Sequence, residues 1–368
     1  MIWSLSALQD ATIYEKDPYR NTGLDQLLEL RKEGDTTTGD LAESRILIKF
    51  DLASLSNILS ENNITINDIS SSLRLYTVLE SELPKTYTIE AKALNSTWEN
   101  GSGYYTYPTS VASNTITDGV TWVDIAGSGS ATWQSLSTGT NGFVYNSEVG
   151  GGVWYTASIA SQSFSFKTDN VVDIDVSDIV KSWYNGAFSN NGFLVTFKNS
   201  EITASNYPLT NIQFHSSETH TVYEPHLYIS WTGSLYSTGS MSVVTYEDSP
   251  IIYTRTFKSE YYKDKKVRVL LGSRAKFPRP TFAQNSTFST MKALPENSYY
   301  QIKDAHSDEV IIPFSEATKI NCNSNGNYFD FYSTMMYPER YYKFEIKAVF
   351  DDITEYFNSN EFIFKITS

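Results

Sequence analysis

The 368-residue chain has one cysteine, Cys322, and only four histidines. A single cysteine cannot form an intrachain disulfide and cannot build a thiolate metal site. Glycine (19) and proline (11) are also too few for a collagen-like or proline-rich chain. No run approaches the roughly 20 apolar residues of a membrane span, and no basic-then-apolar N-terminus indicates a secretion signal. We therefore expect neither a disulfide framework nor a membrane-spanning segment.

Aromatic and apolar residues are plentiful. The sequence is 40% hydrophobic and 14% aromatic, with 26 tyrosines, 20 phenylalanines and seven tryptophans. This composition supplies enough material to bury sizeable cores and excludes wholesale disorder. The length suggests two or three domains of roughly 150 residues each.

Charge and tryptophan content change at the same place along the chain. Residues 1–231 contain 12 Lys/Arg and 26 Asp/Glu, whereas residues 232–368 contain 16 of each. All seven tryptophans lie in the first segment. Two independent shifts at one position, followed by a Gly/Ser/Thr stretch, indicate a domain boundary. We predict domains at 1–231 and 241–368, joined by a linker at 232–240.

Short period-two runs are common, and helix-period runs are rare. The predicted strands of the first domain are 45–51, 72–78, 87–91, 193–197 and 226–231; those of the second are 267–271, 299–303, 309–313, 328–332, 341–349 and 361–366. Two short helices are predicted, with Asp51 and Ser177 as their N-caps. Many short strands separated by turn signals predict an all-β fold of two tandem β-sandwiches. The second and smaller one is immunoglobulin-like in architecture.

Residues for catalysis are hard to nominate. The sequence has no Gly-rich phosphate loop and no Gly-x-Ser-x-Gly elbow, and its acids are too frequent for one pair to stand out. We predict no enzymatic activity, no catalytic residues and no cofactor. A glycan-degrading enzyme with two opposed carboxylates is kept as an alternative. The acidic first domain would repel phosphate backbones, so we expect no nucleic-acid partner.

Two groups of residues are candidates for metal binding. Asp173 and Asp175 share a strand face near Asp178 and could offer oxygens to Ca²⁺, although no calcium loop surrounds them. His215, His220 and His226 lack a ligand pattern such as His-Glu-x-x-His. We expect the three histidines to be surface residues and predict no metal ligands. Whether a metal binds near Asp173 and Asp175 is left open.

Aromatic residues in the long Gly/Ser/Asn-rich region 95–152 could form a binding surface. Exposed rings stack on sugars or anchor protein partners, whereas large aromatics in sandwiches usually point inward. We expect Trp98, Trp122 and Trp183 in the core. The candidate aromatic platform consists of Trp133, Trp154, Tyr104 and Tyr105.

A second candidate surface is basic. Residues 255–279 hold nine Lys/Arg and two acids. Lysines on an edge strand can simply block unwanted strand pairing. They can also dock an acidic partner, such as the first domain of another copy. The candidate interface residues are Lys263, Lys265, Lys266, Arg268, Arg274 and Arg279.

The first domain resembles the DNRLRE family of β-sandwich domains, of jelly-roll type. The similar stretches are 10–14, 21–23, 45–52, 72–76, 97–99, 120–122, 172–176 with Trp183, 191–194 and 225–229. Relatives of this family occur on cell surfaces, as carbohydrate-binding modules and in phage virions. The resemblance implies a role and transfers no functional residue.

The second domain is similar to a domain of structural proteins from large contractile-tailed marine phages. The similar stretches are 261–282, 294–305, 309–314, 327–330, 338–343 and 362–366. Together the two resemblances imply a virion structural protein of the tail, neck or baseplate, assembled in the host bacterial cytoplasm. The implied partners are other virion proteins and copies of the chain itself. The alternative function is a carbohydrate-binding, adhesive module for a host-surface glycan.

Overall fold

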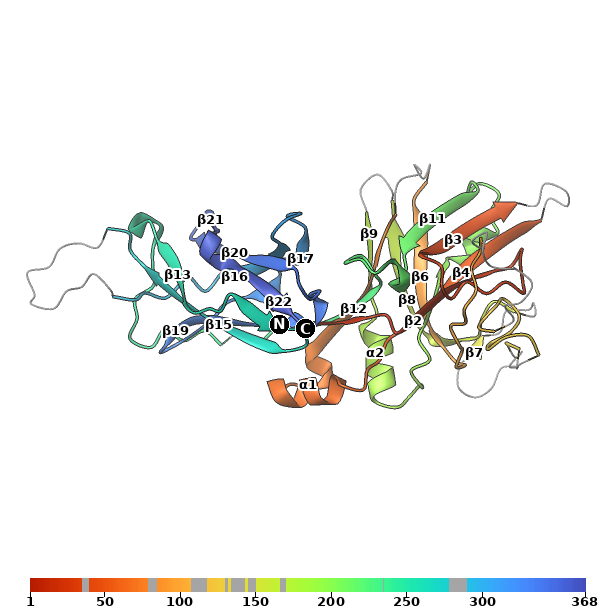
Figure 1. The fold of residues 1–368 in the computed structure, drawn as a ribbon, viewed down its shortest axis with the longest axis horizontal. Coiled ribbons are helices and arrows are strands. Elements are labelled where there is room, and N and C mark those ends of the chain that lie inside the picture. The colour runs from red at the N-terminus through yellow and green to blue at the C-terminus, as the bar shows by residue number, and fades with distance from the viewer. Residues whose placement is uncertain are drawn as a thin grey trace, which may run out of the picture. The chain divides into compact units, whose positions relative to one another are not determined.

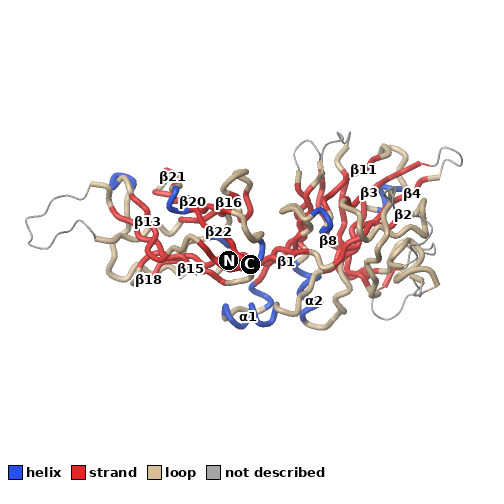
Figure 2. The backbone as a smooth tube through the Cα atoms, viewed as in Figure 1, coloured by secondary structure: helices blue, strands red, loops and turns tan. Residues whose placement is uncertain are grey.

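Figure 1 shows the computed structural model of the chain, in which strands dominate (Figure 2). It describes residues 1–34, 40–78, 85–106, 118–129, 132–133, 150–165, 170–233, 235–277 and 290–368, and the backbone of 143–144. The described residues divide into two compact units. One comprises Leu5–Tyr228, and the other comprises Met1–Ser4 with Ile229–Ser368. The predicted all-β sandwich-type fold is confirmed, and the predicted domain limits stay a prediction.

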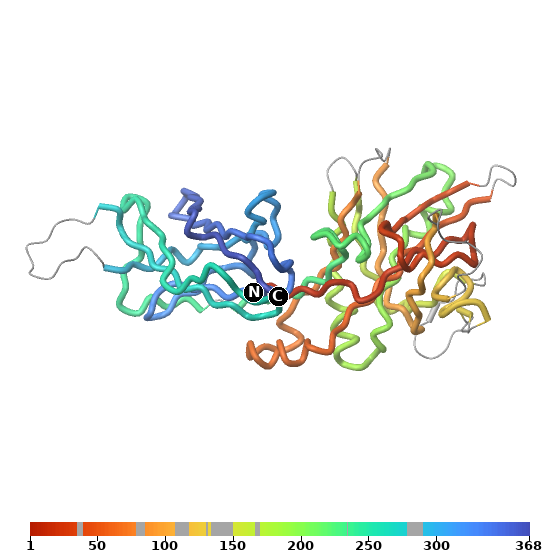
Figure 3. Tube along the Cα trace, in the orientation of Figure 1, coloured from red at the N-terminus to blue at the C-terminus, as the bar shows by residue number. Residues whose placement is uncertain are grey.

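The strands up to Trp231 form two sheets. A four-stranded sheet has the order β1-β12-β5-β9, and an eight-stranded sheet has the order β11-β3-β4-β10-β6-β8-β7, with β2 also paired to β4. Figure 3 follows the chain from its red N-terminal end through these strands. Their bounds are β1 Ile2–Ser6, β2 Gln9–Tyr14, β3 Leu27–Gly34, β4 Leu41–Lys49, β5 Ile69–Tyr76, β6 Tyr87–Leu94, β7 Phe143–Val144, β8 Trp154–Phe164, β9 Val171–Asp175, β10 Phe193–Phe197, β11 Thr210–His215 and β12 His226–Trp231.

The centre of the eight-stranded sheet is buried on both faces. In the antiparallel pair β4–β10, Ile48 lies opposite Phe193 and Leu47 opposite Leu194. Because successive side chains point to opposite faces, Ile48 and Phe193 share one face, and Leu47 and Leu194 share the other. All four are fully buried. The sheet therefore carries a second core on its other face.

The second core is built around tryptophans. Trp98, Trp122, Trp133 and Trp154 pack with the apolar side chains Ala11, Ile13, Leu47, Leu94, Val120, Val153 and Leu194, and we call this cluster the tryptophan core. Two indole N–H groups are satisfied inside it, because Trp98 Nε1 donates to the Asn191 carbonyl at 2.9 Å and Trp133 Nε1 to the Thr121 carbonyl at 3.0 Å. The prediction that Trp98, Trp122 and Trp183 are core residues is confirmed.

Arg45 joins the tryptophan core from β4. Its Nη1 donates to the Gly151 carbonyl at 2.6 Å, and its guanidinium carbon lies 4.8 Å from the Trp122 ring centroid and 5.5 Å from that of Trp154. Gly150 and Gly151 have positive φ, and a Cβ on Gly150 would lie 2.5 Å from the Trp122 carbonyl oxygen. Glycine is needed here because the backbone lies directly on an indole.

The described α-helices are α1 Leu55–Asn62, α2 Ser177–Tyr184 and the single turn α3 Asn199–Ile202. The predicted caps of the first two are wrong. Asp51 accepts from the Ala53 N–H at 2.9 Å in a turn before α1, whose N-cap is Ser54. Ser177 is the first residue of α2, and Asp175 Oδ1 accepts from its N–H at 3.0 Å. None of these helices is long or apolar enough to cross a membrane.

The unit that contains Ile229–Ser368 has two further sheets, with strand orders β13-β15-β19-β18 and β14-β22-β20-β16-β17, the latter with β21 paired to β20. All six predicted strands are present. The bounds are β13 Ile251–Thr256, β14 Glu260–Tyr262, β15 Lys266–Arg274, β16 Ser298–Asp304, β17 Val310–Ile312, β18 Asn321–Asn323, β19 Gly326–Tyr332, β20 Tyr341–Phe350, β21 Ile353–Phe357 and β22 Ile363–Thr367. Aromatic rings fill the core, as in the stacked pairs Tyr300–Phe329 and Phe344–Phe362.

Residues of the predicted linker 232–240 belong to the unit that contains Ile229–Ser368 and form hydrogen bonds with the rest of it. The Leu235 carbonyl accepts from the Cys322 N–H at 2.9 Å, and the Ser237 N–H donates to the Cys322 carbonyl at 3.0 Å. The Tyr236 hydroxyl donates to the Leu294 carbonyl at 2.6 Å. This part of the stretch therefore packs as an extra extended segment beside β18.

Candidate binding site

A cavity of about 760 Å³ opens in the Leu5–Tyr228 unit where three loops meet strands β3 and β11. We call it the tyrosine cavity because two adjacent tyrosines line it. Its lining residues are Leu24, Asp25, Gln26, Leu27, Glu29, Arg31, Tyr104, Tyr105, Thr106, Gln213, Glu218 and His220. Its volume lies within the range of small-molecule sites, and its walls mix aromatic, amide and charged groups.

Asn21 fixes the tyrosine loop in place. Its Nδ2 donates to the carbonyls of Asn100 and Val120, both at 2.8 Å. Its Oδ1 accepts from the N–H groups of Gly23 at 3.2 Å and Gly103 at 2.7 Å. One buried amide therefore makes four hydrogen bonds to three chain segments, which is close to its full capacity.

Two glycines allow these segments to approach. A Cβ on Gly23 would lie 2.2 Å from the Asn100 carbonyl oxygen, and a Cβ on Gly103 would lie 2.4 Å from the Asn21 carbonyl oxygen. Both distances are far below van der Waals contact, so any side chain would separate the loops. The loop that carries the tyrosines is therefore held rigidly against the turn at residues 21–25.

Tyr105 is held on several sides. Its N–H donates to Asp25 Oδ2 at 2.9 Å, and its carbonyl accepts from Arg20 Nη1 at 2.8 Å. Its ring centroid lies 4.6 Å from that of Tyr14 and 4.7 Å from the Arg31 guanidinium carbon. Tyr105 is thus part of the cavity wall, and its half-buried neighbour Tyr104 also lines the cavity.

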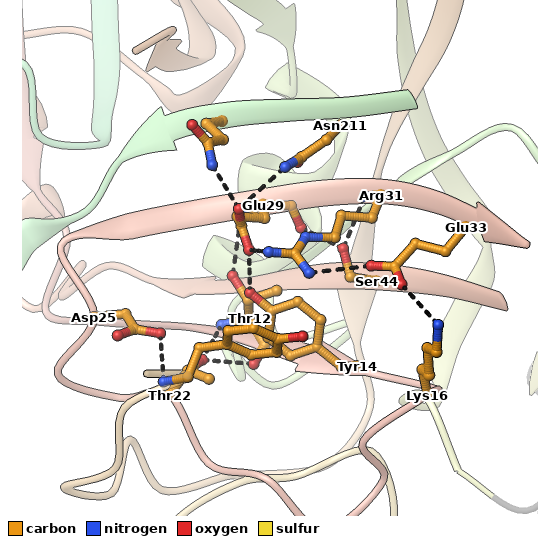
Figure 4. A network of polar contacts seen from close by, with 12 residues as sticks. Thr12, Tyr14, Lys16, Thr22, Asp25, Glu29, Arg31, Glu33, Ser44 and Asn211 are labelled. Atoms are coloured by element: carbon orange, nitrogen blue, oxygen red, sulfur yellow. Dashed lines mark hydrogen bonds and ion pairs between the residues drawn. The ribbon is translucent and has the colours of Figure 1, made fainter. Parts of the chain in front are cut away.

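Glu29 lies at the centre of the polar network in Figure 4 and is only 5% exposed. Its Oε2 accepts from the Tyr14 hydroxyl at 2.6 Å and from Arg31 Nη2. Its Oε1 accepts from Asn211 Nδ2 at 3.2 Å and from Gln213 Nε2 at 2.7 Å. Each carboxylate oxygen therefore accepts two hydrogen bonds from protein groups. Glu29 is thereby committed to holding β2, β3 and β11 together.

Asp25 lies at the edge of the same network. Burial raises the pKa of its carboxyl from 3.8 to about 6, the hydrogen bond from the Tyr105 N–H opposes this rise, and the charge of Glu29 adds to it. Glu218 and His220 come from the turn after β11, which begins at the 3₁₀ helix Ser217–Thr219. The cavity thus gathers acids from three separate segments.

The structure separates the members of the predicted aromatic platform. Tyr104 and Tyr105 line the tyrosine cavity, whereas Trp133 and Trp154 are 2% and 9% exposed and lie in the tryptophan core. The predicted exposure of these two tryptophans is corrected. Gly150 and Gly151, just before Trp154 in the sequence, have positive φ and pack on the Trp122 ring of the same core instead of opening a loop.

The sequence did not reveal the polar half of the cavity. Asp25, Glu29, Arg31 and Gln213 were not among the candidate residues. One usable signal was the alternation of Glu29, Arg31 and Glu33 with apolar Leu28 and Leu30, which indicates a strand with one charged face. The pairing of β3 with β11, which brings Glu29 opposite Gln213, is a long-range contact.

The predicted basic surface is partly neutralised. Arg268 is 56% exposed, yet its Nε and Nη2 donate to the two oxygens of the buried Asp330 at 2.7 and 2.8 Å. Lys266 Nζ lies 3.8 Å from Asp330 Oδ2, and Arg274 Nη1 donates to the Ala275 carbonyl at 3.2 Å. Lys265 is exposed, and Lys263 is half-buried. Arg279 lies outside the described residues.

The candidate metal residues have protein partners. Asp173 Oδ2 accepts from Arg74 Nη2 at 2.7 Å, and Asp175 holds the start of α2. Within the described ranges no group of three or more His, Cys, Asp or Glu gathers around one point. The expectation of three surface histidines is wrong for His226, which is buried among Tyr76 and Tyr228.

Comparisons with known proteins do not assign the chain to a family. Neither the protein-family models nor the curated proteins contain a match to this chain. The resemblances to DNRLRE domains and to phage structural proteins therefore stay predictions.

Proposed function

We propose that the Leu5–Tyr228 unit is a non-catalytic carbohydrate-binding module and that the tyrosine cavity is its binding site. The observation that carries this proposal is the combination of Tyr104 and Tyr105 with convergent polar groups around one open cavity. Amphipathic rings can pack against the apolar face of a sugar ring, while amides and carboxylates hydrogen-bond to its hydroxyls. Gln213, Asp25 and Glu218 supply such groups here.

The rigidity of the walls supports binding. Asn21, Gly23 and Gly103 fix the tyrosine loop, and Glu29 fixes β2, β3 and β11. A site that is already in its binding conformation loses less side-chain and loop entropy when the ligand binds. This matters for sugars, whose individual contacts are weak.

The state of Glu29 supports binding over hydrolysis. Glycoside hydrolysis needs a carboxylate that attacks the sugar or activates a water. Both oxygens of Glu29 are already occupied by protein donors. The most buried acid of the cavity is therefore a structural anchor.

Replacement of Tyr104 tests the proposal. We expect Tyr104→Ala to weaken binding in a glycan array and in calorimetry by about tenfold, which corresponds to about 1.4 kcal/mol. The matched control is Tyr19→Ala, because Tyr19 is 73% exposed in the same unit and does not line the cavity. Its affinity should equal that of the unchanged protein. If no glycan on the array binds, or if both variants lose affinity equally, the proposal is contradicted. If a bound glycan is cleaved and its product released, the unit is an enzyme and not a binding module.

We propose as a second candidate function that the chain is a virion structural protein, in the tail, neck or baseplate, which contacts neighbouring subunits through the basic surface at 263–268. The observation in its favour is the exposure of Lys265, beside the paired Arg268, in a chain whose other segment carries 12 Lys/Arg against 26 Asp/Glu. Such charge complementarity steers association between subunits.

Charge reversal tests this second candidate. Replacing Lys263, Lys265 and Lys266 by Glu should weaken self-association at low salt, as measured by sedimentation. The matched control reverses Lys258, Lys276 and Lys347, which lie outside 263–268 and change the net charge equally. Equal association of the two triple variants would contradict the contact. Absence of the chain from the protein content of purified virions would contradict the structural role.

A further inference from the structure

The charges that line the tyrosine cavity are unbalanced. Three carboxylates line it, from Asp25, Glu29 and Glu218, together with one guanidinium, from Arg31, and the imidazole of His220. Arg31 is shared between two acids, because Nη2 pairs with Glu29 and Nη1 with Glu33 at 3.1 Å. Its positive charge is therefore already neutralised within the wall.

The two remaining acids come from neighbouring turns at one end of the β3–β11 pair, where Ser216 Oγ donates to the Asp25 carbonyl at 2.5 Å and accepts from the Glu218 N–H at 3.1 Å. Asp25 lies on the turn before β3, and Glu218 lies on the turn after β11. Glu218 is half-buried, and its charge helps to raise the pKa of the nearby Asp10.

The carboxyl of Asp25 remains mostly ionised at neutral pH. Arg20, whose charge lowers the pKa of Asp25, offsets part of this negative charge, and Glu33 adds a further carboxylate beside Arg31. The acids still outnumber the guanidinium groups, so a ligand in the cavity meets a net negative potential.

We propose that the tyrosine cavity selects glycans by charge and prefers amino sugars to neutral sugars and neutral sugars to acidic sugars. This inference rests on the proposed carbohydrate-binding function. The carboxylate of a uronic acid would approach Asp25 and Glu218 and would find the cavity guanidinium already paired. A protonated amino group would instead be attracted by both acids. Sites built for anionic ligands commonly present an arginine free for bidentate pairing.

Three oligosaccharides of equal length and linkage test this order, built from glucosamine, glucose and glucuronate. At low salt and neutral pH we expect each class to bind about fivefold more weakly than the one before, because one added charge a few ångströms from a carboxylate changes the binding energy by about 1 kcal/mol or more. Added salt should reduce both differences, because it screens partly exposed charges.

A pair of glutamate variants identifies the source of the selectivity. In Glu218→Gln, the ratio of glucosamine to glucose affinity should fall toward one. Glu61→Gln makes the same charge change on α1, away from the cavity, and should keep the ratio of the unchanged protein. Equal ratios in the two variants would overturn the assignment to the cavity charges.

The outcomes distinguish a failure of the charge selection from a failure of the proposed carbohydrate-binding function. If glucuronate binds as tightly as glucose and Tyr104→Ala abolishes both, the site binds carbohydrate and the charge selection is wrong. If no oligosaccharide binds, or if Tyr104→Ala changes nothing, the carbohydrate-binding function itself fails. If the unchanged protein shows the predicted affinity order and Glu218→Gln loses it, the charge selection and the carbohydrate-binding function are both supported.

Discussion

The Leu5–Tyr228 unit uses its loop aromatics in two different ways. The tryptophans pack against one face of the eight-stranded sheet in an apolar core, with the indole N–H groups of Trp98 and Trp133 bonded to backbone carbonyls. The tyrosines lie among charged and amide side chains and line a cavity. The tyrosines and three of the four tryptophans come from loops rich in Gly, Ser and Asn, and Trp154 is the first residue of β8. Loop composition alone therefore does not separate a buried core aromatic from one that lines a polar cavity, and the polarity of the surrounding side chains does.

The largest expected effect concerns stability. Trp122→Ala should lower the free energy of unfolding by about 3–5 kcal/mol, because it leaves a large cavity in the tryptophan core and removes a ring that packs on Arg45. Tyr104→Ala should cost less than about 1 kcal/mol, as half-buried residues usually do. Urea denaturation measures both. Similar losses in the two variants would show that the two groups of aromatics do not differ in role.

A smaller effect is expected at Asn21, which connects the tyrosine loop to its turn. Asn21→Ala removes four hydrogen bonds and should cost about 2–3 kcal/mol while weakening sugar binding. Asn21→Asp keeps the acceptor oxygen but turns a second carboxylate oxygen toward the carbonyls of Asn100 and Val120, so we expect a loss at least as large in denaturation experiments. Full affinity in Asn21→Ala would mean that the cavity needs no rigid loop.

Next in size is the effect of pH on stability through Asp10, which supports the wall near Glu218. Its Oδ2 accepts from the Ser217 N–H at 2.8 Å, and its Oδ1 has no hydrogen-bond partner among the described residues. Burial raises the pKa of Asp10 from 3.8 to about 7. The folded chain therefore holds this proton over a pH range in which the unfolded chain has released it. Stability should then fall as the pH rises from about 4 to about 7.

The Asp10→Asn variant checks this pH dependence. It should be more stable than the unchanged protein at pH 7.5, by an amount on the order of 2 kcal/mol, and should show a flatter pH profile in thermal unfolding. The control is Asp68→Asn, since hydrogen bonds from Thr65 lower the pKa of this exposed carboxyl. Asp68 favours the folded state when ionised, so its replacement should act in the opposite direction. Parallel profiles for the two variants would contradict the role of burial.

The sequence predicted the strands better than the site. The runs 193–197 and 226–231 coincide with β10 and β12, because their β-branched and aromatic residues are a local signal that favours strands. Strand β3 has a charged face and was missed, although it supplies Glu29 and Arg31. The cavity depends on contacts between residues 21 and 100, 29 and 213, and 25 and 105, which lie far apart in sequence. A single sequence carries no direct record of such pairs.

Exposure was the property that the sequence predicted worst. Glycines near Trp154 suggested an open loop, yet Gly150 and Gly151 allow the backbone to lie against Trp122. Conversely, charged residues such as Lys32 are usually exposed, but Lys32 is buried and donates to the carbonyls of Glu201, Ala204 and Tyr207 at 2.7–2.9 Å. In both cases the burial depends on backbone groups that lie close to the side chain only in the folded chain.

A crystal structure of the protein with a bound glucosamine oligosaccharide would show where the sugar binds. We predict a sugar ring in the tyrosine cavity, packed against Tyr104, with its amino group facing Asp25 or Glu218. A sugar bound elsewhere on the unit, with the cavity empty, would contradict this prediction.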